Sequence, residues 1–135
     1  MNISIDKKNR IMSEEKRKFM RFDAPINIEY NFSGKKIKKL AISKNISRKG
    51  INIFLAEKLN PGIKLELQLS IPDEIIPIFA IGRLIWIEKI DNQSKNRFSA
   101  GIAIEKIAPF DLTTVLQYAY NYWKDNISRK IRKNT

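Results

Sequence analysis

Two short groups of polar residues have the types and spacing to hold an anionic, hydrogen-bonding ligand. The first group contains Arg17 and Arg21, which lie four positions apart in a basic segment. A guanidinium presents a planar set of N–H donors that grips phosphate oxygens or the edge of a base. The second group, Asn45, Ser47 and Gly50, supplies an amide, a hydroxyl and a residue that lets backbone approach a ligand closely. Together they predict a binding site for a phosphorylated ligand.

The sequence lacks the side chains on which most enzymes rely. It contains no cysteine and no histidine, which excludes thiolate nucleophiles, Ser-His-Asp catalysis and most zinc or iron sites. The acidic pairs Glu14-Glu15 and Asp73-Glu74 are chain neighbours without a partner base or the spacing of metal ligands. We therefore expect a non-catalytic protein that needs neither a metal nor a cofactor.

The positive charge of the chain is concentrated in two places. The net charge is +12, and residues 1–49 carry 14 basic but only 5 acidic side chains. Residues 126–135 add four basic and no acidic ones, whereas the segment between them is close to neutral. This distribution favours a local anion site over a uniformly basic surface.

The hydrophobic pattern predicts six short strands followed by one helix. Apolar residues alternate with polar ones, or form short β-rich runs, in six segments: 22–32, 37–42, 51–55, 63–69, 78–87 and 98–104. After Pro109 the period changes, and apolar residues recur at helical spacing from Leu112 to Trp123, which predicts a helix of about four turns. Six strands with turns every 8–15 residues are typical of a small antiparallel barrel or sandwich.

The apolar face of the first predicted hairpin suggests how its strands pair. Pairing Ile26 with Ile42 and Ile28 with Leu40 places all four side chains on one buried face. The same register brings Arg21 opposite Ser47 at the open end of the hairpin. The two polar groups, although distant in sequence, are therefore expected to form one composite site.

These residues resemble the signature of a known family. The spacing Arg17-x-x-x-Arg21, followed by Asn45-x-Ser47-x-x-Gly50, is similar to the RxxxR and [DN]xSxxG motifs of PilZ domains, which are bacterial receptors for cyclic di-GMP. The segments 82–86 and 101–104 and the closing helix are similar as well, so the resemblance covers roughly residues 14–125. It implies an all-β fold, a six-stranded antiparallel β-barrel of the split-barrel type, with a C-terminal α-helix.

The resemblance also implies a role for each motif residue. Arg17 and Arg21 would contact phosphate and guanine edges of cyclic di-GMP. Asn45 and Ser47 would hydrogen-bond a base or phosphate, and Gly50 would keep the turn open. No cofactor is implied besides this ligand.

Three positions next to the motifs bear on the ligand site. Lys16, directly before the first motif, is a second-rank candidate contact. Lys49 stands where a second glycine is frequent in the family, and Asn45 stands where aspartate is the usual choice. Neither departure breaks the motif, but Lys49 could change how the turn packs.

The chain divides into three parts in this interpretation. Residues 1–12 form a flexible lead-in, residues 13–125 a PilZ-like barrel domain with its helix, and residues 126–135 a basic tail. The longest apolar stretch is far shorter than the roughly 20 residues of a spanning helix. The N-terminus lacks the apolar core of a secretory signal, so we expect a cytoplasmic protein.

We expect the protein to be a receptor for cyclic di-GMP that orders its N-terminal segment toward an effector protein. Two other classes stay open. A basic barrel could bind RNA or single-stranded DNA, although we do not expect nucleic acid to be the partner. A PilZ-like adaptor could bind protein and no nucleotide, and a homodimer could form through the C-terminal helix.

Overall fold

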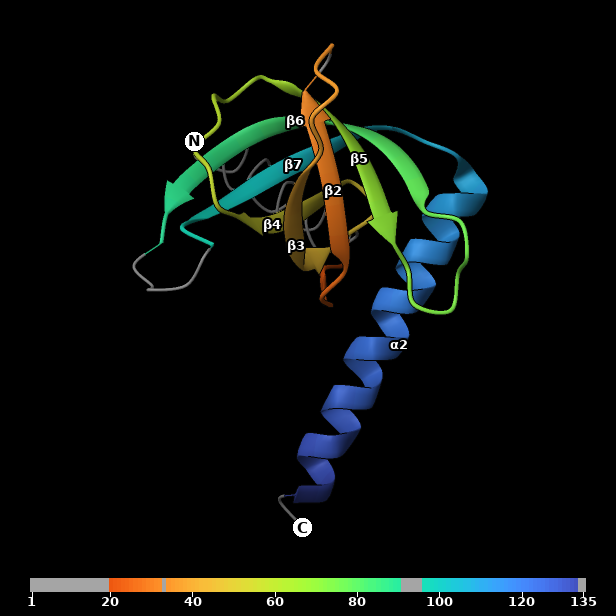
Figure 1. Cartoon of the computed structure of the whole chain (residues 1–135). Coiled ribbons are helices and arrows are strands. Elements are labelled where there is room, and N and C mark those ends of the chain that lie inside the picture. Colours follow the sequence, from red (N-terminus) through yellow and green to blue (C-terminus); the bar gives the residue numbers. More distant parts are fainter. Residues whose placement is uncertain (1–19, 33, 91–95, 134–135) are drawn as a thin grey trace, which may run out of the picture.

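One antiparallel sheet closes on itself to form a barrel. The computed structural model describes residues 20–32, 34–90 and 96–133. The elements are β1 (Phe22–Asp23), β2 (Asn27–Phe32), β3 (Lys39–Ile46), β4 (Gly50–Leu55), β5 (Lys64–Ser70), β6 (Ile78–Lys89), β7 (Phe98–Ile107) and α2 (Pro109–Lys133). The strand order is β3–β2–β5–β6–β7–β4, and β4 pairs back with β3 (Figure 1). The predicted six-stranded antiparallel barrel with a C-terminal helix is confirmed.

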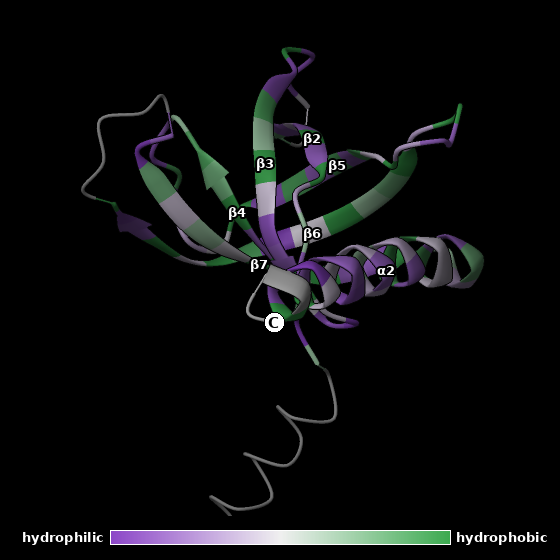
Figure 2. Cartoon of the chain, turned by 90° about the horizontal axis from the view of Figure 1, so that it is seen from below, coloured by the Kyte–Doolittle hydropathy of each residue, from purple (hydrophilic) through white to green (hydrophobic). Residues whose placement is uncertain are grey.

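Aliphatic side chains fill the barrel interior because strand residues alternate between inward and outward directions. Ile28, Ile53, Leu67, Leu84 and Ile102 come from five different strands, and each is at most 2% exposed. Burying one such side chain stabilises a fold by about 1.5–3 kcal/mol. Figure 2 shows the resulting alternation of hydrophobic and hydrophilic residues along the strands.

The register of β2 on β3 differs from the prediction by one residue. Ile42 pairs with Asn27 rather than with Ile26, and the predicted pair of Ile28 with Leu40 is displaced in the same way. Leu40 consequently lies on the outer face of the barrel and is 74% exposed. The prediction that these apolar residues share one buried face is wrong, because the inward positions of β3 carry smaller residues than its pattern indicates.

The prediction for the open end of the hairpin is confirmed by the two-residue strand β1. Asp23 pairs with Asn45, and Phe22 pairs with Ile46. β1 and β2 therefore follow each other along the same edge of β3, offset by one residue. Because of this offset, β1 has the register predicted for the open end of the hairpin, and Arg21 lies beside the turn after β3.

The side chain of Ser43 holds the junction between β1 and β2. Its hydroxyl donates to the carbonyl oxygen of Ala24 at 2.5 Å and accepts the N–H of Ile26 at 2.7 Å. Pro25 stands between these two residues and has no N–H of its own. Ser43 is only 3% exposed, so its hydroxyl satisfies backbone groups that water cannot reach.

The helix α2 is longer than the hydrophobic periodicity predicts. It begins at Pro109, whose missing N–H is tolerated in the first turn, and it continues for 25 residues to Lys133. The stretch 126–133, which we expected in a basic tail, is helical. Lysine, arginine and isoleucine continue a helix readily, and no glycine or proline interrupts this stretch.

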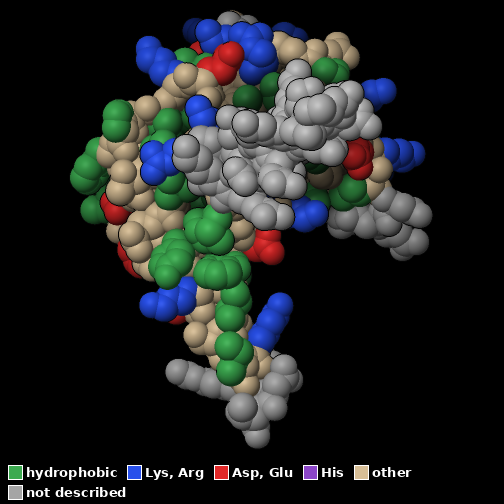
Figure 3. Space-filling view, turned by 180° about the vertical axis from the view of Figure 1, so that it is seen from behind, with side chains coloured by type: hydrophobic (Ala, Val, Ile, Leu, Met, Phe, Trp, Pro, Cys, Tyr) green, Lys and Arg blue, Asp and Glu red, His purple; other side chains and the backbone are tan. Residues whose placement is uncertain are grey.

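The first part of α2 packs closely against the barrel. Val115 and Ala119 are at most 1% exposed, and Phe22 of β1 packs against Tyr120 and Trp123 with ring centroids 5.5 Å apart in both pairs. Hydrophobic side chains continue along α2 where it leaves the barrel (Figure 3). Within the described ranges, no helix combines the length and apolarity needed to cross a membrane.

A carboxylate anchors the loop after β4 to the β2–β3 hairpin. The Tyr30 hydroxyl donates to Glu57 Oε1 at 2.7 Å, and Lys39 Nζ donates to Glu57 Oε2 at the same distance. Burial acts to raise the pKa of Glu57, but the hydrogen bonds from Lys39 and Tyr30 and the charges of Lys39 and Lys35 outweigh it and lower that pKa. Burial, together with the Glu57 carboxylate, raises the pKa of Tyr30.

Replacing Ser43 should show how much the junction between β1 and β2 depends on one hydroxyl. We expect Ser43→Ala to lower the free energy of unfolding by about 1–3 kcal/mol, because two buried backbone groups lose their partner. Urea unfolding followed by circular dichroism measures this change. Ser70→Ala, at an exposed end of β5, is the matched control and should stay within about 0.5 kcal/mol of wild type. Equal stability of the two variants would contradict the assignment.

The lowered pKa of Glu57 predicts a loss of stability in acid. Its ionised form stabilises the fold above the ordinary carboxyl pKa, and this contribution disappears as pH falls through the lower pKa of the folded state. We expect wild type to unfold at a higher temperature than Glu57→Gln at about pH 7. This difference in unfolding temperature should shrink at about pH 3. A difference that is the same at both pH values would count against the ion pair.

Candidate functional site

The turn that joins β3 to β4, residues 45–50, is built by one of its own side chains. Ser47 N donates to the carbonyl oxygen of Gly50 at 2.9 Å. Ser47 Oγ accepts the N–H of Lys49 at 3.3 Å and of Gly50 at 3.2 Å, and Ser47 is 2% exposed. Serine hydroxyls favour turns because they can bond nearby backbone in this way. The Ser47 hydroxyl therefore fixes the shape of the turn from inside.

Gly50 is needed where β4 meets β7. A Cβ atom built on Gly50 would lie 2.8 Å from the carbonyl oxygen of Ile102, closer than such atoms can approach. Gly50 pairs with Ala103, and Ile104 N donates to the carbonyl oxygen of Lys49 at 2.9 Å. The glycine thus allows the end of the turn to lie flat against the neighbouring strand.

Arg21 and Asn45 face each other at the outer surface beside this turn. Arg21 Nη1 donates to Asn45 Oδ1 at 3.2 Å across the end of the β1–β3 pair. The remaining N–H groups of an exposed guanidinium can bind phosphate or a base edge. The arrangement therefore joins a cation and an amide in one exposed patch, which we call the Arg21–Asn45 pair.

The structure brings together four of the five motif residues predicted from sequence. Arg21 and Asn45 lie at the surface, while Ser47 and Gly50 shape the turn beneath them. Arg17 and the lower-ranked Lys16 lie outside the described residues, as does the predicted lead-in 1–12.

A row of outward residues extends the Arg21–Asn45 pair across four strands. Asn45 pairs with Asn52 on β4, Asn52 pairs with Gly101 on β7, and Gly101 pairs with Trp86 on β6. The indole of Trp86 lies over Gly101, where any larger side chain would collide with it. An amide and an aromatic ring on the outer face of the sheet suit a planar, hydrogen-bonding ligand.

The two sequence motifs include neither Asn52 nor Trp86. The alternation in 50–55 does place Asn52 on the outward face, but only the barrel closure by β4 sets it beside Asn45. Trp86 is 37% exposed, so its ring both packs on the sheet and offers a surface.

The basic run around β3 is divided between the two ends of the strand. At one end Lys39 pairs with Glu57 at 2.7 Å, and Lys38 pairs with Glu29 at 3.8 Å. Lys44 lies at the other end, directly before the turn. Part of the positive charge near β3 is thus balanced by carboxylates, and Lys44 lies next to Asn45 at the motif end.

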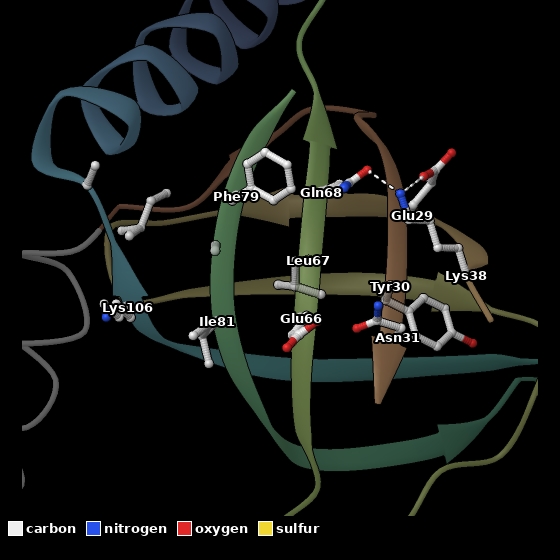
Figure 4. A pocket seen from close by; sticks show the side chains of 13 residues that line it. Glu29, Tyr30, Asn31, Lys38, Glu66, Leu67, Gln68, Phe79, Ile81 and Lys106 are labelled. Atoms are coloured by element: carbon white, nitrogen blue, oxygen red, sulfur yellow. Dashed lines mark hydrogen bonds and ion pairs between the residues drawn. The ribbon is translucent and has the colours of Figure 1, made fainter. Parts of the chain in front are cut away.

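A separate hollow of about 340 Å³ lies on the outer surface of β2, β5 and β6 (Figure 4). Phe79, Ile81 and Gln68 line it, and the Lys38 ammonium group lies between the side chains of Gln68 and Glu29 at its rim. None of the described motif residues lines this hollow. Its chemistry is therefore distinct from that of the Arg21–Asn45 pair.

Within the described part of the chain, no cluster of histidine, cysteine, aspartate or glutamate could hold a metal ion. Arg21, Asn45 and Asn52 offer hydrogen-bond donors and acceptors rather than an activated nucleophile or a base. The site is therefore suited to binding.

Comparison with known protein families identifies one match. The sequence model of the PilZ domain family matches residues 15–121. No curated protein matches the chain.

Solved structures share the fold at low sequence identity. The Bacillus subtilis inhibitor of motility (MotI/DgrA) aligns with a TM-score of 0.64 and 23% identity, covering 88% of this chain and 53% of that protein. The chain therefore spans about half the length of that relative.

Two further structures contain cyclic di-GMP. The PilZ domain of YcgR from Escherichia coli aligns with a TM-score of 0.63 and 14% identity over 87% of this chain and 98% of that one. PlzA from Borreliella burgdorferi aligns with a TM-score of 0.55 and 12% identity over 94% of this chain and 58% of that one. Because the family model covers most of its length, and solved PilZ structures share its fold, the chain belongs to the PilZ domain family.

Proposed function

We propose that this protein is a non-catalytic cytoplasmic receptor for cyclic di-GMP. The observation that carries the proposal is the hydrogen bond between Arg21 and Asn45, which joins the two sequence motifs at one exposed position. Cyclic di-GMP carries two phosphates and two guanines, and guanidinium and amide groups bind both kinds of group.

In this proposal some motif residues contact the ligand and others shape the turn. Arg17 and Arg21 bind phosphate and guanine edges, and Asn45 bonds a base or phosphate beside them. Ser47 and Gly50 hold the turn in the shape that presents Asn45. Lys16 adds a weaker cationic contact.

Signal relay follows from the position of the arginines before β1. A ligand held by Arg17 and Arg21 at once would order the segment that carries them against the barrel. The partner that reads this change would be an effector protein, or a second copy of the chain packing on α2. Ile131, 60% exposed near the end of that helix, offers an apolar contact for either one.

Isothermal titration calorimetry with cyclic di-GMP at near-physiological salt tests the receptor function. We expect saturable binding to wild type, and a loss of at least about tenfold in affinity for Arg21→Ala, because a charge-assisted hydrogen bond is removed. Arg97→Ala, an exposed arginine before β7, is the matched control and should bind like wild type. GTP and linear pGpG should give no comparable heat.

Other outcomes of this titration favour the alternative classes. Binding to RNA or single-stranded DNA that is steeply salt-dependent and indifferent to sequence would favour a nucleic-acid-binding barrel. If the protein is folded but gives no heat of binding with any nucleotide, the result would favour an adaptor that binds protein.

The outward row predicts a further contact on β4. We expect Asn52→Ala to weaken cyclic di-GMP binding by about 2- to 10-fold, the range for one neutral hydrogen bond. Asn60→Ala, in the exposed loop after β4, should leave the affinity unchanged. If the two variants bind equally, the ligand does not extend across the row from Asn45.

A further inference from the structure

A groove of about 730 Å³ lies between α2 and the outer face of the barrel, next to the motif site. Its floor contains Ile42 and Phe54, which pair with each other on β3 and β4. Trp123 and Lys130 line it from α2, and Lys44 and Asp23 line it from the strands. We call this space the helix groove.

The helix groove is continuous with the Arg21–Asn45 pair. Asp23, which lines the groove, is the backbone partner of Asn45, and Lys44 directly precedes Asn45. Phe22, next to Arg21, packs its ring against Trp123 at 5.5 Å. On β1 and on β3, residues that line the groove therefore lie next to the Arg21–Asn45 pair. A ligand bound at this pair is adjacent to the groove.

The lining of the helix groove matches the parts of a guanine nucleotide. Trp123 and Phe54 supply aromatic faces for a base, and Lys44 Nζ lies 5.9 Å from the centroid of the Phe54 ring. Lys44 and Lys130 supply cations for phosphate oxygens. Asp23 supplies a carboxylate, which accepts from the N–H donors on the edge of guanine.

The same lining disfavours an apolar occupant. A hydrophobic helix or strand in the groove would bury three charged side chains, and unpaired buried charges are costly. A nucleotide brings phosphates and polar base edges that these charges can bind.

We propose that the helix groove receives one guanine and its phosphate from the cyclic di-GMP held at the Arg21–Asn45 pair. In this arrangement Trp123 packs on the base and Lys130 binds the phosphate. The helix α2 is then part of the binding site, not only a support for the barrel. This inference rests on the proposed function.

Two substitutions one position apart on α2 test the groove. Lys130→Ala should weaken cyclic di-GMP binding by about 5- to 10-fold in calorimetry, because a cation that faces the phosphate is removed. Arg129→Ala removes the same charge from an exposed position outside the groove lining and should change the affinity by less than about twofold. Circular dichroism checks that both variants keep the helix.

An NMR measurement distinguishes direct contact between the ligand and α2 from a long-range effect of charge on affinity. An NMR experiment on the complex should show a nuclear Overhauser effect between guanine H8 and the indole protons of Trp123, assigned with a Trp123→Phe variant. Equal affinities of Lys130→Ala and Arg129→Ala, or a complex without this effect, would overturn the groove assignment.

The results also distinguish the two proposals. If wild type binds cyclic di-GMP and Arg21→Ala abolishes it, while Lys130→Ala binds normally, the receptor function stands and only the groove assignment fails. If wild type does not bind cyclic di-GMP at all, the receptor function fails and the groove assignment fails with it.

Discussion

The hydroxyl of Ser43 is the contact on which the geometry of the site depends. It bonds Ala24 and Ile26 on either side of a proline, and so joins two strand segments whose registers differ by one residue. Without that offset, the register of β2 would carry Arg21 past Asn45. A buried polar group in the barrel core therefore sets the position of a surface arginine about twenty residues away in sequence.

The residues of the turn motif have two different physical roles. Ser47 and Gly50 act inward, because one hydrogen-bonds the turn backbone and the other lets β4 approach β7. Asn45 acts outward, where it accepts from Arg21. A motif of this kind thus combines residues that build the backbone with residues that meet the ligand.

Much of the fold and part of the site could be predicted from residue pattern alone. The alternation of apolar residues predicts the six barrel strands, and Arg21 lies beside the turn motif at the open end of the hairpin, as predicted. The pairing of β2 could not be predicted, because the apolar residues of β3 are partly exposed and the polar Ser43 is buried. The contribution of Asn52 depends on barrel closure, which brings together strands that local patterns treat as independent.

Because α2 is long, a small tilt where it contacts the barrel produces a larger displacement at its C-terminal end. The ring of Phe22 meets the helix at Tyr120 and Trp123, and about ten further residues project beyond that contact over about 15 Å. A tilt of about 10° at this pivot would displace the last turn of the helix by about 3 Å, roughly the width of a water molecule. The tilt of the helix is thus coupled to the position of Phe22, the residue next to Arg21.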